Sequence, residues 1–308
     1  MKKILFASTA LIVTAGIASA EVTLGGYGRV GLLYNEGNAN ETEIEQRMRL
    51  NITGIAETDA GVKLEARFRI QSDSASNSSI AGSAAGAAGF AVSYGGLRVD
   101  VGNVSNVMDS GDQVDLFGYG VGFTSFLEHN ANFGAPTVGF DNENQDFTTV
   151  KASYAFGDFS TSVSYYDDKV ANDEQFQIGL GYTLANGMSI GAVYSDTDSE
   201  GDYWVLGLNG TAGAVGYSVI VGDGDNQNDT SFGASINYEV SSATSIRAMV
   251  SSGDVIDTDG VGGTDFDDDV SYGLGFRHGL GGGVTLAGGV GSNNRGNTMA
   301  DLGVVFNF

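Results

Sequence analysis

Two groups of residues in this chain could do chemistry: a serine with two candidate histidine bases, and a series of closely spaced charges. The segment Gly187-Met-Ser189-Ile-Gly191 matches the GxSxG pattern, which in some hydrolases presents a nucleophilic serine. The bases available to such a serine are His129 and His278. The segment follows a turn and precedes a strand-like stretch instead of a helix, so we do not expect a serine nucleophile here.

The charges alternate with apolar side chains between residues 61 and 71. A repeat of two predicts a β-strand whose two faces meet different environments. Opposed rows of charge create an electric field that orients dipolar solutes, and this requires no catalytic step. The polar face of this segment carries Lys63, Glu65, Arg67, Arg69 and Gln71.

The same alternation recurs along the rest of the chain and predicts about sixteen strands of roughly nine to fourteen residues. Strands of this length cross a bilayer at a tilt of about 45°. Short turns alternate with longer polar loops, an asymmetry typical of outer-membrane barrels. We therefore predict an all-β fold, a closed 16-stranded antiparallel transmembrane β-barrel, because an open edge would leave backbone groups unsatisfied in lipid. The predicted longer loops are 36–42, 72–86, 104–146, 168–173, 197–201, 222–229, 253–269 and 292–297.

The first residues have the layout of a secretory signal peptide. Two lysines precede an apolar run over residues 4–17, and small residues follow up to Ala20. We predict that residues 1–20 are removed and that residues 21–308 form the barrel. Later in the chain no run of eighteen apolar residues occurs, so we expect no membrane-spanning helix.

The composition narrows the class of protein further. Removing the two lysines of the signal peptide leaves 12 basic against 38 acidic residues, a net charge near −26. Such an acidic chain is a poor partner for the phosphates of nucleic acid, so we expect no nucleic-acid binding. The chain contains no cysteine, so no disulfide framework is expected.

Aromatic residues gather on the apolar face, close to predicted strand ends. This distribution fits an aromatic girdle at a membrane interface, so the apolar face should contact lipid and the polar face a water-filled lumen. Arg67 and Arg69 would then face the lumen. The girdle residues are Tyr154, Phe156, Phe159, Tyr182, Tyr238, Phe306 and Phe308.

Three segments resemble the general trimeric porins of photosynthetic purple bacteria and other alphaproteobacteria. They are Glu21-Val-Thr-Leu-Gly-Gly-Tyr-Gly-Arg29, Leu97-Arg-Val-Asp-Val-Gly-Asn103 and the terminal Val304-x-Phe306-x-Phe308. The resemblance implies a homotrimer in the outer membrane of a Gram-negative cell. It implies a passive diffusion channel for small hydrophilic solutes and ions, with no enzyme activity and with the long third loop folded into the lumen.

In that family an acidic inner loop faces a basic wall, and this sequence looks similar. Residues 104–146 contain seven acids and neither Lys nor Arg. The loop lacks the enterobacterial Pro-Glu-Phe-Gly-Gly signature, so its positions cannot be matched one by one. Lys63 and Arg98 lie near turns and are expected at the channel mouth, whereas the role of the inward-facing Lys151 stays open. The predicted constriction comprises the basic Arg29, Arg47, Arg49, Arg67 and Arg69 and the acidic Asp109, Asp112, Asp115 and Glu128.

Two other classes of protein stay open at this point. One is a β-barrel outer-membrane enzyme, which would need a Ser–His or Asp–His constellation at a barrel end. The other is an acidic calcium-binding surface protein, with oxygen ligands in residues 254–269. Calcium is also possible in the loop 104–146, and no other cofactor is expected. A single-channel conductance would distinguish a porin from both alternatives.

Overall fold

The structure is a computed structural model that describes residues 20–73, 87–140, 147–255 and 270–308. The predicted signal peptide lies almost entirely outside the described residues, and its cleavage stays a prediction. The first strand begins at Glu21.

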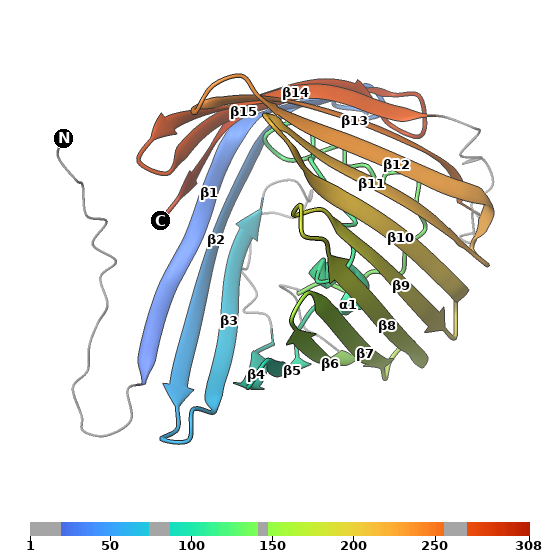
Figure 1. Cartoon of the computed structure of the whole chain (residues 1–308). Coiled ribbons are helices and arrows are strands. Elements are labelled where there is room, and N and C mark those ends of the chain that lie inside the picture. Colours follow the sequence, from blue (N-terminus) through green and yellow to red (C-terminus); the bar gives the residue numbers. More distant parts are fainter. Residues whose placement is uncertain (1–19, 74–86, 141–146, 256–269) are drawn as a thin grey trace.

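Sixteen strands close into one antiparallel barrel, in which each strand pairs with its neighbours in the chain and β1 pairs with β16 (Figure 1). The prediction of a closed 16-stranded barrel is confirmed. The strands are β1 (Glu21–Asn35), β2 (Thr42–Glu57), β3 (Lys63–Asp73), β4 (Gly89–Tyr94), β5 (Leu97–Gly102), β6 (Phe147–Phe156), β7 (Phe159–Asp168), β8 (Asp173–Thr183), β9 (Ser189–Thr197), β10 (Gly201–Ala212), β11 (Val215–Gly224), β12 (Gln227–Glu239), β13 (Thr244–Val255), β14 (Ser271–Gly281), β15 (Val284–Ser292) and β16 (Thr298–Asn307).

The first and last strands seal the barrel along their length. Val30 lies opposite Val304 in this register. Beyond the end of β16, the backbone N–H of Gly26 donates to the carbonyl of Phe308 at 2.9 Å, and the N–H of Phe308 donates back at 3.1 Å. Pairing therefore continues to the last residue, which satisfies backbone groups that lipid could not.

The outward faces of the strands are apolar and exposed. Leu24 and Leu32, for example, are 64% and 55% exposed. Near the β6–β7 turn the rings of Phe156 and Phe159 stack with centroids 5.6 Å apart, and Phe159 contacts Tyr182 at 4.6 Å. Amphipathic rings collect at membrane interfaces, so these contacts place the predicted girdle on the lipid-facing surface.

The predicted loops fall at alternate strand connections, between the predicted short turns, with one difference from prediction. The predicted loop 222–229 is wrong in extent, because β11 runs to Gly224 and β12 begins at Gln227. Gly222 pairs with Ser231 in this register. The ends of these two strands form a hairpin of polar residues and glycine. Apolar side chains do not alternate there, so the sequence of this segment resembles that of a loop.

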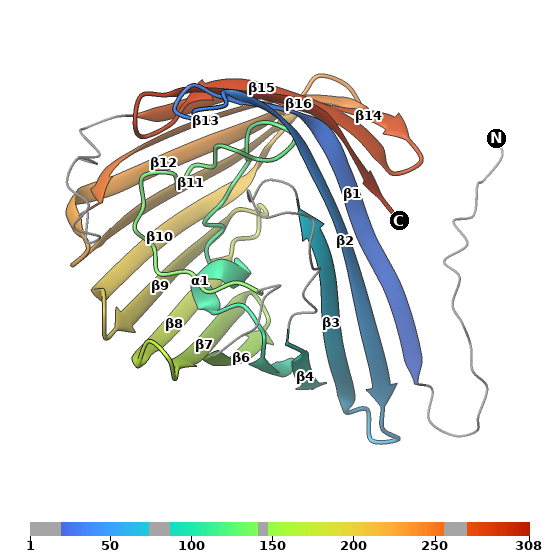
Figure 2. The same ribbon diagram turned by 180° about the vertical axis from the view of Figure 1, so that it is seen from behind.

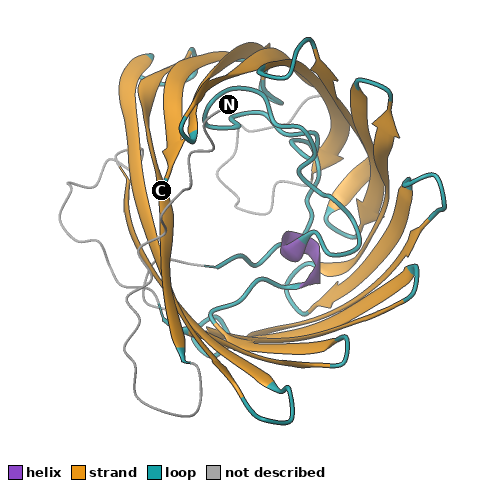
Figure 3. Ribbon diagram, turned by 60° about the vertical axis from the view of Figure 1, so that its left-hand side comes forward, coloured by secondary structure: helices purple, strands orange, loops and turns teal. Residues whose placement is uncertain are grey.

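The described part of the segment that follows β5 lies inside the barrel (Figures 2 and 3). It begins with the single-turn helix α1 (Val107–Ser110), whose N-cap Asn106 accepts a hydrogen bond from the N–H of Asp109 at 2.9 Å. Residues 103–140 of this segment are described, and we call them the inner loop. Within the described ranges, no helix is long and apolar enough to cross a membrane.

An apolar core lies between the inner loop and the wall. Met108, Val114 and Leu116 pack against wall residues that point inward. Apolar side chains can point inward beneath the loop, because the loop excludes water from that part of the wall. The inward apolar residues of this core are Val193, Tyr203, Val205 and Ile220.

Candidate functional site

Hydrogen bonds fix the inner loop to the wall formed by β7 to β16. At its start, the N–H of Met108 donates to Gln177 Oε1 at 3.0 Å. Further along, the N–H of Tyr119 donates to Ser235 Oγ at 2.9 Å. The loop thus covers one side of the lumen and faces β1 to β3 across it (Figure 2).

Glycines on the wall let the loop approach closely. A Cβ atom built on Gly191 would lie 1.9 Å from the carbonyl oxygen of Gln113, and one on Gly233 would lie 2.0 Å from that of His129. Any larger side chain at these two positions would push the loop into the lumen. The glycines on the inner face therefore help to set the width of the channel.

Two of the five predicted basic wall residues are neutralised by acids of neighbouring strands. Arg29 Nε donates to Glu45 Oε1 at 2.8 Å, and Glu45 is 1% exposed. Arg47 forms an ion pair with Asp73. These arginines therefore pair with wall acids and not with acids of the inner loop.

The other three basic wall residues make no ion pair within the described residues. Arg49 Nε donates to Gln71 at 2.6 Å, and Arg69 Nε donates to Asn51 at 3.1 Å. Arg67 and Arg69 lie over the ring of Phe140, at 4.3 and 4.2 Å from its centroid. Phe140 belongs to the inner loop, so this end of the loop reaches the basic wall. Nearby carboxylates attract these arginines without a direct ion pair, for example Asp100 in the case of Arg67.

The four predicted acids occupy different places along the inner loop. Asp109 on α1 attracts Arg69 electrostatically. Asp112 binds Lys151 Nζ at 2.8 Å on the wall next to the loop. Asp115 accepts the N–H of Gly118 at 2.9 Å.

Glu128 is the fourth of these acids and is half-buried. Burial, aided by the negative charge of Asp115, raises the pKa of Glu128 to about 7, and the positive charge of Arg277 opposes this shift. Of the four acids, Asp109 is the one that interacts with a predicted basic wall residue among the described side chains. The constriction role of all nine residues stays a prediction.

Three charged residues that contact the inner loop were not among the predicted site residues. Arg247 Nη1 donates to the carbonyl of Gly120 at 3.3 Å, and Arg277 Nη2 donates to that of Gly122 at 3.3 Å. Asp301 accepts the N–H of Phe123 at 3.0 Å. Because side chains alternate between the two faces of β13, β14 and β16, all three of these side chains point inward. Their inward orientation could therefore be predicted from the sequence.

Comparison with known proteins decides the family. The family model described as Gram-negative porin matches residues 7–298 of the chain. The chain belongs to this family. It is a channel protein of the outer membrane, not an enzyme, and the predicted resemblance is confirmed.

Two porins of known sequence are similar over their whole length. The porin of Fuscovulum blasticum is 33% identical over 313 residues, which cover 94% of this chain and 100% of that protein. The porin of Rhodobacter capsulatus is 27% identical over 326 residues, with the same coverage of 94% and 100%. Among solved structures, a triple mutant of Rhodopseudomonas blastica porin has a TM-score of 0.77 at 28% identity, covering 93% of this chain and 100% of its own.

The two predicted mouth residues of this porin, Lys63 and Arg98, lie at strand ends next to short turns. Lys63 Nζ binds Glu65 at 2.8 Å, and Arg98 Nη2 binds Glu65 at 3.1 Å and Asp100 at 2.8 Å. The predicted mouth residues therefore form one linked network. Lys151, whose role was open, holds the inner loop through Asp112.

The histidines of this porin do not form a catalytic site. His129 is buried, with Nδ1 3.1 Å from Ser235 Oγ and Nε2 3.1 Å from the carbonyl of Asp115. His278 Nδ1 contacts Thr244, while Ser189 contacts Thr183. Both histidines thus bind hydroxyls of the barrel wall.

Metal binding finds little support in the described part of the chain. No group of three or more His, Asp or Glu side chains there is arranged to hold a metal ion. Most of the predicted calcium-binding segment 254–269 lies outside the described residues. Calcium in the loop 104–146 stays a hypothesis.

Proposed function

We propose that the protein is a passive diffusion channel for small hydrophilic solutes and ions, constricted between the inner loop and the basic wall of β2 and β3. One observation carries this proposal. Arg67 and Arg69 contact Phe140 of the inner loop while making no ion pair among the described residues. Charge at a narrow point affects every solute that passes.

The charges at this point create a field across the channel. Arg49, Arg67 and Arg69 supply the positive side, and Asp109 on α1 supplies negative charge opposite Arg69. A dipolar solute aligns with such a field, whereas a bulky apolar solute gains nothing from it and loses its freedom to rotate. The large acid surplus elsewhere attracts cations to the mouths, so we expect a modest cation preference overall.

Reconstitution into a planar bilayer tests this function. Discrete conductance steps in potassium chloride are expected, with a cation preference that weakens as salt rises from about 0.1 M towards 1 M, because the Debye length falls from about 10 Å to about 3 Å. Liposomes containing the protein should swell in a small neutral sugar. Purified, folded protein that produces neither conductance nor swelling would overturn the proposal.

We further propose that the barrel assembles as a homotrimer. The resemblance to trimeric porins supports this, and the outer surface of β1 exposes large apolar side chains such as Leu24 and Leu32. An unheated detergent sample should migrate as a trimer and a boiled one as a monomer; a single monomeric species under both conditions contradicts this.

Processing and metal content are two further proposals. We propose that the mature protein begins at Glu21, so its intact mass should correspond to residues 21–308. Retention of residues 1–20 in the outer membrane would contradict this. We propose no resident cofactor for passive diffusion. Unfolding temperatures with calcium and with a chelator should therefore agree, and a clear rise with calcium would favour a site in the loop 104–146.

A further inference from the structure

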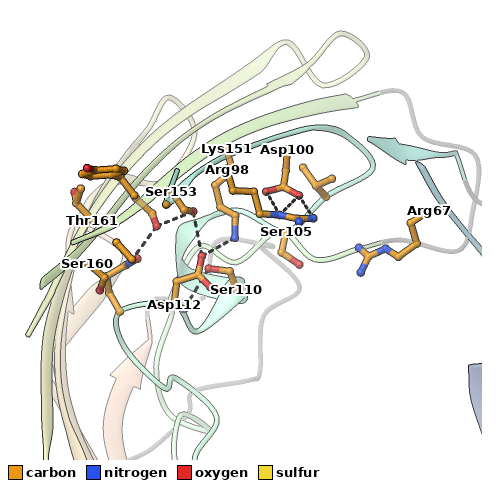
Figure 4. Close-up of a pocket in the computed structure, with 16 residues that line it drawn as sticks. Arg67, Arg98, Asp100, Ser105, Ser110, Asp112, Lys151, Ser153, Ser160 and Thr161 are labelled. Atoms are coloured by element: carbon orange, nitrogen blue, oxygen red, sulfur yellow. Dashed lines mark hydrogen bonds and ion pairs between the residues drawn. The ribbon is translucent and has the colours of Figure 1, made fainter. Parts of the chain in front are cut away.

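A cavity of about 480 Å³ opens on the inner wall, where the start of the inner loop meets β5, β6 and β7 (Figure 4). This volume lies in the range of sites that bind small molecules. The lining comes from rigid strands on one side and from α1 and its flanking residues on the other. The cavity therefore has fixed walls, although it opens to the lumen.

Among the charged side chains of the cavity, one basic group forms no direct ion pair within the described residues. Lys151 pairs with Asp112 and Arg98 pairs with Asp100, each at 2.8 Å. Figure 4 shows Arg67 apart from both pairs. Among the described residues Arg67 makes no hydrogen bond or ion pair; it lies over the ring of Phe140 and is attracted by Asp100, which already binds Arg98. The planar guanidinium can therefore present its N–H groups to a ligand carboxylate.

Hydroxyl groups form the second part of the lining. Ser162 Oγ lies 2.9 Å from Ser153 Oγ, which lies 3.3 Å from Asp112. The hydroxyls of Ser105 and Ser160 make no hydrogen bond within the described residues and are free for a ligand. A hydroxyl both donates and accepts, so a row of hydroxyls matches a ligand that itself carries several. The hydroxyl-bearing residues of the cavity are Ser105, Ser110, Ser153, Ser160, Thr161 and Ser162.

We propose that this cavity is a solute subsite for small hydroxylated carboxylates of the sugar-acid class. The ligand carboxylate binds Arg67, and its hydroxyls bind the serines of the opposite wall. This inference rests on the proposed function, since a solute reaches the cavity through the channel. It adds a substrate class to a channel that otherwise selects by size and charge.

Other small solutes match the lining less well. An amino acid needs a free carboxylate for its ammonium group, but both acids of the cavity already bind basic side chains. A neutral sugar satisfies the hydroxyls and leaves Arg67 without an anion. Inorganic phosphate uses the charge and leaves most of the hydroxyls unused. The sugar acid is the class that uses both features.

Three probes of similar size separate the contributions of charge and hydroxyls. Gluconate carries both, sorbitol carries only hydroxyls, and hexanoate carries only the charge. Binding to the detergent-solubilised protein is measured by calorimetry at low salt, with inorganic phosphate as a fourth ligand. Gluconate should bind at least about tenfold more tightly than any other probe, because a charged hydrogen bond and several neutral ones act together.

Variants then assign the binding to this cavity. Arg67→Gln should weaken gluconate binding about tenfold, whereas Arg69→Gln should not, because Arg69 shares the contact with Phe140 but does not line the cavity. Ser105→Ala combined with Ser160→Ala should weaken gluconate binding and leave hexanoate binding unchanged. These hydroxyls support no other part of the fold, so the double variant should assemble normally.

The outcomes distinguish this inference from the proposed function. Protein that conducts potassium chloride but binds gluconate no better than hexanoate, sorbitol or phosphate overturns the subsite alone. Equal losses from Arg67→Gln and Arg69→Gln also overturn it, because they would indicate general attraction of anions to the basic wall. Absence of conductance overturns the proposed function, and the calorimetry still decides whether the subsite exists.

Discussion

The carboxylate of Asp301 on β16 accepts hydrogen bonds from both the backbone N–H and the hydroxyl of Thr124, at 2.9 and 2.8 Å. It also accepts the N–H of Phe123 at 3.0 Å. Asp301 is 6% exposed, so its charge is compensated by these three donors and by the nearby Arg277. One acid on the last strand therefore holds the middle of the inner loop.

Removing this carboxylate should release the middle of the loop. Asp301→Ala leaves three donors without an acceptor, and each lost hydrogen bond to a charged group costs about 1.5–3 kcal/mol. We expect a lower unfolding temperature and larger fluctuations of the open-channel current in single-channel recordings. Asp59→Ala, in the exposed turn between β2 and β3, is the control and should change neither. Equal current noise in both variants would contradict the anchoring role.

The close approach at Gly191 predicts a different effect on the channel. Gly191→Ala places a methyl group 1.9 Å from the carbonyl of Gln113, so the loop must move into the lumen. We expect lower conductance and a loss of stability of about 1–3 kcal/mol from overpacking. The matched control is Gly54→Ala, because a Cβ there meets no atom within 4 Å. A normal conductance for Gly191→Ala would show that the loop is not held at this distance.

The barrel could be predicted from sequence because each strand repeats one simple constraint. A strand with lipid on one side and water on the other has to alternate, and this pattern identified both the strands and the inward arginines. The same alternation places the side chain of Glu45 on the inner face beside Arg29 and Arg47. Ion pairs between acids and arginines of the wall were therefore predictable in principle. Which acid meets which arginine depends on the register between strands, which alternation alone does not specify.

The path of the inner loop could not be predicted in the same way. Its residues have no repeat, and they satisfy their backbone groups with wall side chains more than 50 positions away, such as Gln177 and Ser235. A partial signal does exist on the wall. Inward glycines such as Gly191 and inward valines such as Val205 are out of place beside water and fit a surface that something covers.

Charge substitutions test the proposed constriction. Arg67→Gln with Arg69→Gln removes two positive charges that form no ion pair within the described residues, so the reversal potential under a salt gradient should shift towards cations. Replacing Asp109, Asp112 and Asp115 together by Asn should shift it towards anions. The uptake of a small sugar should be measured in parallel, because a change in width would alter it as well.

A charge-neutral pair provides the control for this prediction. Arg29→Gln with Glu45→Gln removes one positive and one negative charge that already bind each other at 2.8 Å. The reversal potential should stay unchanged in this double variant. If the Arg67 and Arg69 variant also leaves selectivity and flux unchanged, these residues do not form the constriction, although the barrel and the channel remain.

The raised pKa of Glu128 predicts that the inner loop responds to pH. Burial and the negative charge of Asp115 raise this pKa from the ordinary 4.5 to about 7, so the docked loop favours the neutral acid. The resulting stability is fully present below about pH 4.5 and is lost as pH rises through about 7. Burial lowers the pKa of His129 below its usual 6.5, so the neighbouring imidazole is neutral in the upper part of this range.

Single-channel recordings at several pH values between about 4.5 and about 8 test this response. Current fluctuations and cation preference should both increase with pH, because ionised Glu128 loosens the loop and adds a negative charge to the lumen. Glu128→Gln carries no charge at any pH and should behave throughout like the wild type at low pH. Glu57→Gln, at an exposed position at the end of β2, is the control for removing one acid, and this variant should keep the same pH dependence as the wild type. If Glu128→Gln keeps the same pH dependence as the wild type, another group is responsible and Glu128 does not couple the loop to pH.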